Sequence, residues 1–255
     1  MTNSLIKALQ LNKKGVISLI GAGGKTSLMF LLAKKLSQSK KRVLTTTTTK
    51  IFMPEPDFSP DTIIEDDVNE LIKKARCNTK HYHHFSAGRK HDTISGKLKG
   101  FEPEIIDHLW QTKIFDWIIV EADGAKQKPL KSSNLNEPVI SKATTHLILV
   151  TGLDAVGKTL DENHVHRPEI FSDNTGLGMG EKIDAQSIAS SIGFEIKKAK
   201  SFCSSSLNFI LLNKADTYSR KASGNKIAKI LKPDENIEKI IIASLKDKTS
   251  VKNIA

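Results

Sequence analysis

The chain has little cysteine, few aromatic residues and no long apolar segment. Its 255 residues include two cysteines, Cys77 and Cys203, which lie far apart and form no CxxC motif. This excludes a disulfide-stapled extracellular domain and favours a reduced, cytoplasmic protein. No apolar run approaches the ~18 residues of a membrane-spanning helix. We therefore expect neither a membrane segment nor a membrane partner.

Acidic residues are also few beside the basic ones. There are 28 Asp and Glu against 39 Lys and Arg, which gives a formal net charge of +11. A basic balance suits nucleic acid, an anionic partner or an anionic small molecule. However, aromatic residues make up 5% of the chain and do not interleave with the lysines as a base-stacking platform requires. Solvated helix faces account for most of the lysines, and we do not expect a nucleic-acid partner.

Short apolar runs alternate with helical patterns along the chain. Continuous apolar runs predict strands buried on both faces, and their alternation with helices predicts a mostly parallel sheet in a three-layer α/β/α fold. We expect one domain over residues 1–255, with an insertion or small subdomain near residues 54–100 at the sheet edge. The predicted strands are Val16–Ile20, Val43–Thr47, Trp117–Glu121, Leu147–Thr151, Phe209–Asn213 and Ile240–Ala243, and the predicted helices are Ser27–Ser37, Asp67–Ala75, Glu102–Gln111, Asp184–Ile192 and Lys221–Leu231.

A glycine-rich loop ending in Lys-Thr joins the first predicted strand to the first predicted helix. Glycines let backbone N–H groups converge on a phosphate, and the helix N-terminus adds partial positive charge. The loop is shortened to GxxGK[ST], because Leu19 stands where the full motif has its first glycine. The alternative is an ordinary glycine-rich turn. The residues assigned to phosphate and Mg²⁺ are Gly21, Ala22, Gly23, Gly24, Lys25, Thr26 and Ser27.

Two acidic residues follow the predicted strand Trp117–Glu121. Glu121 and Asp123 are two residues apart, so an extended strand end would point both carboxylates the same way. In a phosphate-loop protein, such acids hold Mg²⁺ and orient the attacking water. We therefore assign catalytic roles to Lys25, Glu121 and Asp123 and metal binding to Thr26, Glu121 and Asp123. The alternative is a strand end capped by solvated acids.

The sequence Asn213-Lys214-Ala215-Asp216 follows another predicted strand. In this position Asn-Lys-x-Asp is the guanine-reading motif of GTPases, because a carboxylate accepts from guanine N1–H and the 2-amino group together. Adenine offers neither donor there and would leave the carboxylate unpaired. The motif favours GTP over ATP, and binding without base preference remains the alternative. The residues assigned to the base are Asn213, Lys214 and Asp216.

Further cationic residues lie at predicted strand ends and in the long loop over residues 152–180. Lys50 ends a run of threonines and is a candidate for phosphate or a second anionic ligand. His166 and Arg167 suit an anion clamp better than a metal site, since a metal requires three or four ligands. For all three, an exposed and solvated side chain is the alternative.

These motifs, in this order, resemble the YqeC family, which is linked to accessory proteins of selenium-dependent molybdenum hydroxylases. The resemblance rests on GAGGKTS, the TTTTTK run, KLKGF at 97–101, VEADGA, KPLK at 128–131, TGLDAVGK, HRPE and LLNKAD. It implies a phosphate-loop protein that matures a molybdenum hydroxylase, with the enzyme or its maturation proteins as partners. A molybdopterin-type cofactor would be the second ligand.

Two wider resemblances bear on mechanism. ExxG at 121–124 with NKxD is similar to metallochaperone GTPases that serve nickel and cobalamin enzymes, whereas the shortened loop looks like that of Mur-type ligases. We expect a Mg²⁺-dependent nucleoside triphosphatase, with GTP the favoured nucleotide. An ATP-dependent kinase, ligase or nucleotidyltransferase acting on the cofactor is one alternative. A nucleotide-binding chaperone without hydrolysis is the other.

Overall fold

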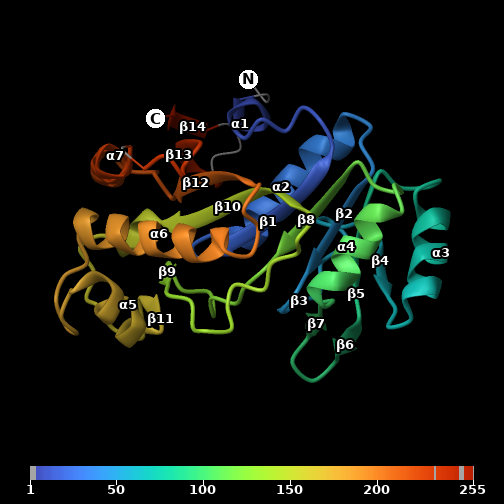
Figure 1. Cartoon of the computed structure of the whole chain (residues 1–255), viewed down its shortest axis with the longest axis horizontal. Helices are drawn as coiled ribbons and strands as arrows, with labels where there is room; N and C mark the ends of the chain where they lie inside the picture. Colours follow the sequence, from blue (N-terminus) through green and yellow to red (C-terminus); the bar gives the residue numbers. More distant parts are fainter. Residues whose placement is uncertain (1–3, 233, 247–249, 255) are drawn as a thin grey trace.

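A computed structural model describes residues 4–232, 234–246 and 250–254 of the chain (Figure 1). The helices are α1 (Ser4–Ala8), α2 (Lys25–Gln38), α3 (Val68–Asn78), α4 (Pro103–Gln111), the 3₁₀ turn η1 (Leu153–Ala155), α5 (Pro168–Thr175), α6 (Ala185–Lys200) and α7 (Tyr218–Leu231). The strands are β1 (Gly15–Gly21), β2 (Val43–Thr47), β3 (Lys50–Phe52), β4 (Thr62–Ile64), β5 (His84–Gly88), β6 (Lys90–Asp92), β7 (Lys97–Lys99), β8 (Trp117–Glu121), β9 (Leu130–Lys131), β10 (Thr144–Gly152), β11 (Val165–His166), β12 (Leu207–Asn213), β13 (Lys239–Ser244) and β14 (Ser250–Ile254).

The main sheet has the strand order β14-β13-β12-β10-β1-β8-β2-β5-β4. Its neighbouring strands run parallel, apart from β14, which is antiparallel to β13. The central strands are buried on both faces, as their apolar runs predicted. Because the strands are parallel, their carboxyl ends meet at one edge of the sheet, and β1 brings the glycine loop to the middle of that edge.

Helices cover both faces of the main sheet (Figure 1). On one face, α1 and α2 pack against a cluster that includes Ile17 and Leu19 of β1. On the other, α5, α6 and α7 pack around Ile20, and α3 and α4 pack around Val16. Alternate residues of one strand thus point to opposite cores. This confirms the predicted three-layer α/β/α fold with a mostly parallel sheet.

Local sequence explains where several helices begin. Asp67 caps α3 by accepting a hydrogen bond from Glu70 N, and Thr217 caps α7 by accepting from Arg220 N. Asp184 and Ser187 form a reciprocal capping box at the start of α6. All six predicted strands and all five predicted helices are present in the described residues, with ends that match or differ by up to eight residues.

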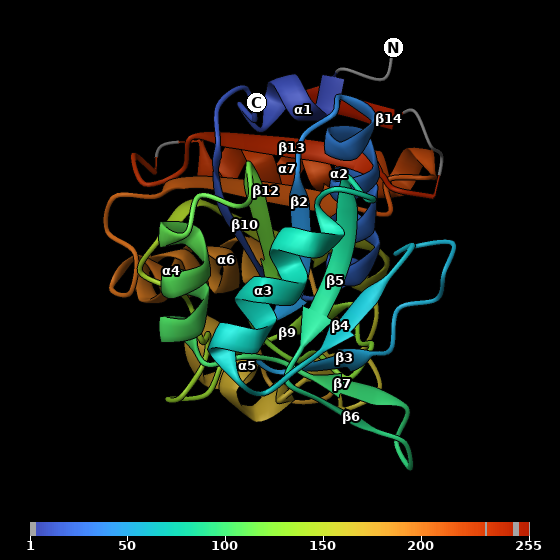
Figure 2. The same cartoon turned by 90° about the vertical axis from the view of Figure 1, so that its right-hand side faces the viewer.

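Residues 54–100 divide between two sheets. β4 and β5 extend the main sheet, with α3 between them. β6 and β7 pair with β3 in a separate antiparallel sheet of order β3-β7-β6. Figure 2 shows this small sheet lying below the arrowheads of β4 and β5. It therefore projects from the same edge of the main sheet as the glycine loop.

No helix in the described part of the chain is both long and apolar enough to cross a membrane.

Candidate phosphate-binding site

The glycine loop turns sharply between β1 and α2. β1 ends at Gly21, and Gly24 is the N-cap of α2 with φ of 136°, a value that L side chains rarely adopt. Gly23 has φ of 79°, and a Cβ there would lie 2.5 Å from Gly152 N. Both glycines are therefore required by backbone conformation and by close packing, since a Cβ at Gly24 would lie 2.3 Å from Asn213 Nδ2. The turn leaves Lys25 and Thr26 in the first turn of α2, where the helix N-terminus favours an anion.

Glu121 lies directly beside the loop. β8 pairs with β1 in parallel, and Leu19 is the register partner of Glu121. The Thr26 hydroxyl donates a hydrogen bond of 2.7 Å to Glu121 Oε2. Burial raises the pKa of Glu121, although the nearby Lys25 ammonium and the Thr26 hydrogen bond oppose that effect. The structure thus brings together the hydroxyl and the carboxylate that the sequence assigned to Mg²⁺.

Lys25 is held between both predicted acids. Its Nζ lies 2.9 Å from Asp123 Oδ1 and 3.7 Å from Glu121 Oε1, and it donates a hydrogen bond of 2.5 Å to Gly21 O. Burial favours the neutral amine, but the charges of Asp123 and Glu121 outweigh it and raise the pKa of Lys25. The lysine is therefore protonated although it is buried, since the residue as a whole is 4% exposed.

Asp123 lies beneath the loop and is fully buried. Its Oδ2 accepts a hydrogen bond of 2.9 Å from Gly21 N and lies 3.0 Å from Lys131 Nζ. These contacts fix the first loop residue to the end of β8. Both carboxylates contact Lys25 Nζ, but only Glu121 lines the open cleft described below, whereas Asp123 is fully buried and contacts the backbone of the loop.

A chain of buried charges continues behind Asp123. Lys131 is 1% exposed at its side chain, and its Nζ lies 2.6 Å from Glu137 Oε2 and 3.0 Å from Gly124 O. Arg167 donates to both oxygens of Glu137, at 2.7 and 3.2 Å. Burial opposes ionisation of Glu137, but hydrogen bonds from Arg167 and Lys131 prevail and lower its pKa to about 2. Arg167, predicted as an anion clamp, is therefore engaged within the protein.

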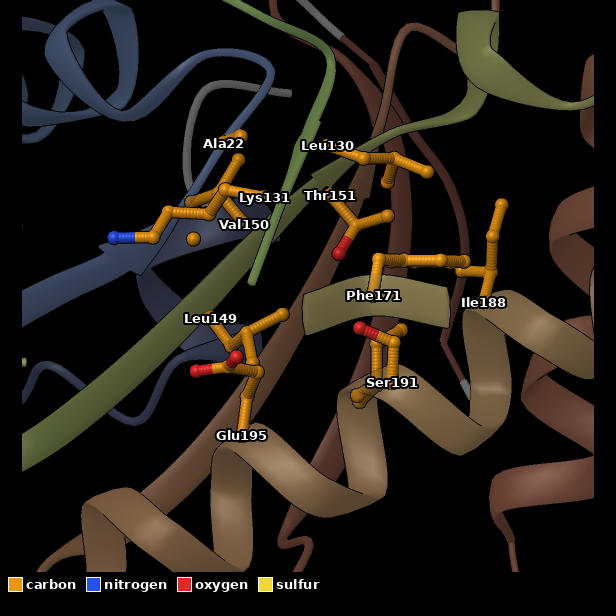
Figure 3. Close-up of a pocket in the computed structure, with 12 residues that line it drawn as sticks. Ala22, Leu130, Lys131, Leu149, Val150, Thr151, Phe171, Ile188, Ser191 and Glu195 are labelled. Atoms are coloured by element: carbon orange, nitrogen blue, oxygen red, sulfur yellow. The ribbon is translucent and has the colours of Figure 1, made fainter. Parts of the chain in front are cut away.

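A small cavity lies between the loop, β10 and α6 (Figure 3). Its volume is about 20 Å³, which is room for roughly one water molecule. Glu195 and Ser191 project into it from α6, opposite Leu149 and Thr151 of β10 (Figure 3). Burial raises the pKa of Glu195, and its Oε1 accepts a hydrogen bond of 2.7 Å from Ser133 N. The cavity thus adjoins Gly21 and Ala22 of the loop, and its polar groups lie among apolar side chains such as Phe171.

Sequence reasoning assigned no role to Lys131, Glu137 or Glu195. β9, which carries Lys131, is two residues long, and Glu137 lies in a loop. Neither segment has a periodic pattern that would show burial. The KPLK run at 128–131 marks the position of Lys131, but only the structure shows that this lysine is buried between two carboxylates.

The predicted base-reading residues adopt three different positions. Asn213 is buried, its Nδ2 donates to Gly23 O at 2.7 Å, and its Oδ1 accepts from Leu245 N at 3.0 Å. Lys214 pairs with Asp154 at 2.7 Å, and its side chain lines the cleft. Asp216 is exposed and forms an ion pair of 2.9 Å with Arg220. Asn213 therefore ties the loop to β12 and to the segment after β13, and only Lys214 and Asp216 face outward.

Replacing Asn213 with alanine is expected to weaken both folding and ligand binding. The change leaves Gly23 O and Leu245 N without this partner, which should lower the free energy of unfolding by about 2 kcal/mol. It should also lower affinity for a nucleoside triphosphate about tenfold, because the loop loses its anchor. Chemical denaturation and calorimetric titration measure the two effects.

Asn208→Ala is the matched control for this prediction. Asn208 is also buried on β12, and its Nδ2 donates to Asn236 O at 3.0 Å, at the end of the strand away from the loop. This variant should lose similar stability and keep the affinity. Equal loss of affinity in both variants would mean that the Asn213 effect is not local to the loop.

An open cleft of about 860 Å³ lies over the loop and Glu121. This volume suits a ligand of nucleotide size. The cleft is markedly basic. Its lysines are Lys25, Lys50, Lys97, Lys99, Lys126, Lys128 and Lys214, and its other lining residues include Gly23, Gly24, Thr26, Ser27, Glu137 and His166.

In the part of the chain that the structure describes, no group of three or more His, Cys, Asp or Glu side chains could hold a metal ion, and His166 therefore belongs to no such group. His166 lines the cleft, and burial together with the Arg167 charge lowers its pKa to about 4, so it is neutral at pH 7. His164 instead pairs with Asp161 through Nδ1 at 2.8 Å. Thr26 and Glu121 are side-chain oxygen donors that adjoin the loop and line the cleft.

Comparison with known sequences identifies a family. The model of the YqeC protein family matches residues 17–169. A sequence named uncharacterized protein YqeC, from Escherichia coli strain K12, is 40% identical over 166 residues, which is 64% of this chain and 61% of that protein. The match thus spans less than two thirds of the relative.

Distant similarity also exists to solved structures. FtsY of the Physcomitrella patens chloroplast aligns with 99% of this chain and 69% of its own, at 12% identity and a TM-score of 0.43. The hydrogenase maturation factor HypB of Archaeoglobus fulgidus aligns with 96% of this chain and 89% of its own, at 12% identity and a TM-score of 0.39. Similarity at this level says nothing about which ligands this chain binds.

Proposed function

The chain belongs to the YqeC family, and we propose that it binds a nucleoside triphosphate with Mg²⁺ and hydrolyses it. One observation carries this proposal: Thr26 and Glu121 are hydrogen bonded at 2.7 Å, beside Lys25, at the floor of a basic cleft. A hydroxyl and a carboxylate are hard oxygen donors, and Mg²⁺ in nucleotide sites takes one or two carboxylates together with phosphate oxygens. The donor set therefore fits Mg²⁺.

The residues of the loop divide the work of holding the triphosphate. The backbone N–H of Gly24 and the N-terminus of α2 bind phosphate oxygens, whereas Gly23 N already donates to Lys128 O at 3.2 Å. Lys25 exchanges its carboxylate partners for the phosphates. Its positive charge then stabilises the negative charge that develops on the leaving phosphate group in the transition state. Thr26 and Glu121 hold Mg²⁺, which would neutralise phosphate charge when bound. Asp123 positions the loop through Gly21 N and Lys25.

We assign guanine preference to Asp216 and Lys214. Both follow β12, whose end lies beside the loop because Asn213 bonds to Gly23 O. Asp216 is paired with Arg220 on the surface, and that pair exchanges for guanine N1–H and the 2-amino group when the base docks. Lys214 lies along the cleft wall, where its stem can cover the base.

The test is calorimetric titration with non-hydrolysable GTP and ATP analogues in the presence of Mg²⁺. The native protein should prefer GTP by about 100-fold, and Asp216→Ala should reduce that ratio to about threefold or less. Arg220→Met is the control, because it breaks the surface ion pair and keeps the carboxylate. A native protein that binds both analogues equally, with Asp216→Ala unchanged, would rule out base reading by Asp216.

The biological role rests on the family resemblance. We propose maturation of a selenium-dependent molybdenum hydroxylase in the cytoplasm, with a molybdopterin-type cofactor as the second ligand. One structural observation favours an alternative, an ATP-dependent kinase, ligase or nucleotidyltransferase. The cleft extends past the loop to Lys50, Lys97 and Lys99, which leaves space for a second substrate. Product formation from such a substrate, measured against triphosphate consumed, separates the enzyme from a switch or a chaperone without hydrolysis.

A further inference from the structure

One face of the small sheet carries a row of lysines in register. Lys50 of β3 is the Cα partner of Lys99 of β7, and Lys90 of β6 pairs with the same Lys99 from the other side. Residues directly opposite on neighbouring strands have Cβ atoms about 4.5–5.5 Å apart, and like charges placed so are destabilising. All three lysines are exposed. The row is thus an unfavourable arrangement that an anion would relieve.

The lysine row has no acidic partner in an ion pair among the described residues. Next to it on the same face, Lys97 pairs with Phe52 and Asp92. Lys97 Nζ lies 5.4 Å from the centre of the Phe52 ring, which is 56% exposed. Asp92 accepts hydrogen bonds from the Ser95 hydroxyl and backbone within its own turn. Hydrogen bonds from Ser95 are the main cause of the lowered pKa of Asp92, and the charge of Lys50 also contributes, so this carboxylate offsets part of the repulsion within the row.

The opposite face of the small sheet explains why the lysines must point outward. Ile51 and Leu98, which alternate with the lysines, are register partners and are buried in the core cluster under α2. A one-residue shift of register would bury the lysines and expose this apolar pair. The small sheet thus packs on the core through its apolar face, and its lysine face lines the cleft.

The face lies close to the catalytic carboxylate. Thr47, the last residue of β2, is the register partner of Glu121 and donates to its backbone oxygen at 2.7 Å. β3 begins three residues later at Lys50. Just after β7, Gly100 N donates a hydrogen bond of 2.9 Å to Thr49 O, which holds the end of β7 beside the start of β3. Lys50, Lys97 and Lys99 line the same cleft as Lys25 and Thr26.

We propose that this face binds a second ligand, a small phosphate ester with an aromatic or apolar group. Its phosphate lies between Lys50 and Lys99, and its ring lies against Phe52. The proposal rests on the proposed function in one respect, namely that the rest of the cleft holds the triphosphate. A nucleic acid fits less well, because sequence-independent strand binding uses several stacked aromatic residues along a groove, and this face offers Phe52.

Phenyl phosphate is the probe, because it joins a dianionic phosphate to one ring. It is titrated by calorimetry, at constant ionic strength, into protein already saturated with Mg²⁺ and the non-hydrolysable analogue. Saturable binding is expected, weakened about 30-fold by Lys50→Gln with Lys99→Gln. Phe52→Ala should weaken phenyl phosphate and leave inorganic phosphate unchanged. The control is Lys221→Gln with Lys229→Gln, which removes the same charge from α7, at the far end of the molecule (Figure 1).

Three outcomes would overturn the proposal. They are no saturable binding to the loaded protein, equal weakening in the α7 control, and displacement of the analogue by phenyl phosphate, which would make these lysines part of the triphosphate site. Tighter, lysine-row-dependent binding of a single-stranded oligonucleotide would replace it with a nucleic-acid surface. If the analogue itself does not bind, the proposed function fails, and the same titration of unloaded protein still tests the lysine face.

Discussion

Lys25→Met is expected to lower affinity for the Mg²⁺-bound triphosphate analogue by about 100- to 1,000-fold, because charge-assisted bonds to several phosphate oxygens are lost. Lys25 is the first residue of α2, and its ammonium lies beside the N-terminus of that helix. Methionine keeps the length of the side chain and removes its charge. Calorimetric titration measures the affinity, and thermal unfolding shows whether the variant is folded at the temperature used.

The change at Lys25 also leaves Glu121 and Asp123 facing each other without their shared ammonium. Glu121 can limit the damage by taking up a proton, since burial already raises its pKa. Lys126→Met is the control, because it removes an exposed lysine of the same cleft that carries no such pair. It should change affinity by no more than about threefold. If Lys25→Met binds as the native protein does, phosphate binding by this loop is refuted.

The fold was largely predictable because the sequences of its central strands are clearly apolar. β1, β8 and β12 are mostly apolar and buried on both faces, and each is followed by a break in the apolar pattern, at glycines after β1 and at charged residues after β8 and β12. The edge elements lack this signal. β5, with the sequence HFSAG, is buried because neighbouring strands and helices cover it, and His84 is bonded to Thr45 at 3.0 Å. Burial lowers the pKa of His84 to about 4, which keeps it neutral in the core.

Helix lengths were less predictable than helix positions. The pattern of α6 was expected to end at Ile192, where Gly193 follows, but the helix continues to Lys200. Packing of Ile196 and Ala199 into the core outweighs the local penalty of a glycine, about 1 kcal/mol. α5 was not predicted, since it has eight residues and follows Arg167, a left-handed N-cap with φ of 66°.

The side chains that line the cleft at the loop were predictable, whereas the buried contacts beneath the loop were not. Local spacing places Lys25 and Thr26 at a helix start and Glu121 at the end of the neighbouring strand, so their meeting follows from a parallel sheet. Asp123 lies past the end of β8, where the alternation of a strand no longer applies, and it turns under the loop. Its partner Lys131 comes from β9, a two-residue strand whose position depends on tertiary contacts.

The buried ion pairs of Lys131 beneath the loop lead to the second prediction, a large loss of stability. Lys131→Met is expected to lower the free energy of unfolding at pH 7 by about 3–5 kcal/mol, because it removes a buried cation from the buried Asp123 and the half-buried Glu137, which keep only Lys25 and Arg167 as partners. The affected groups are Asp123, at 3.0 Å, and Glu137, at 2.6 Å. Denaturant titration followed by circular dichroism measures the change. Lys128→Met, three residues earlier and partly exposed, is the control and should change stability by less than about 1 kcal/mol.

The pH dependence identifies the mechanism of that loss. In the native protein the pKa of Glu137 is about 2, below its usual value, so its contribution to stability is complete above the unfolded pKa of about 4.3 and is lost as pH falls through 2. Without Lys131 the carboxyl group protonates more readily, and the stability gap between native protein and variant should narrow from pH 7 to pH 3. Adding Glu137→Gln to Lys131→Met should likewise recover part of the loss at pH 7. A gap that stays constant with pH, and a double variant no more stable than Lys131→Met, would instead point to lost packing around the lysine stem.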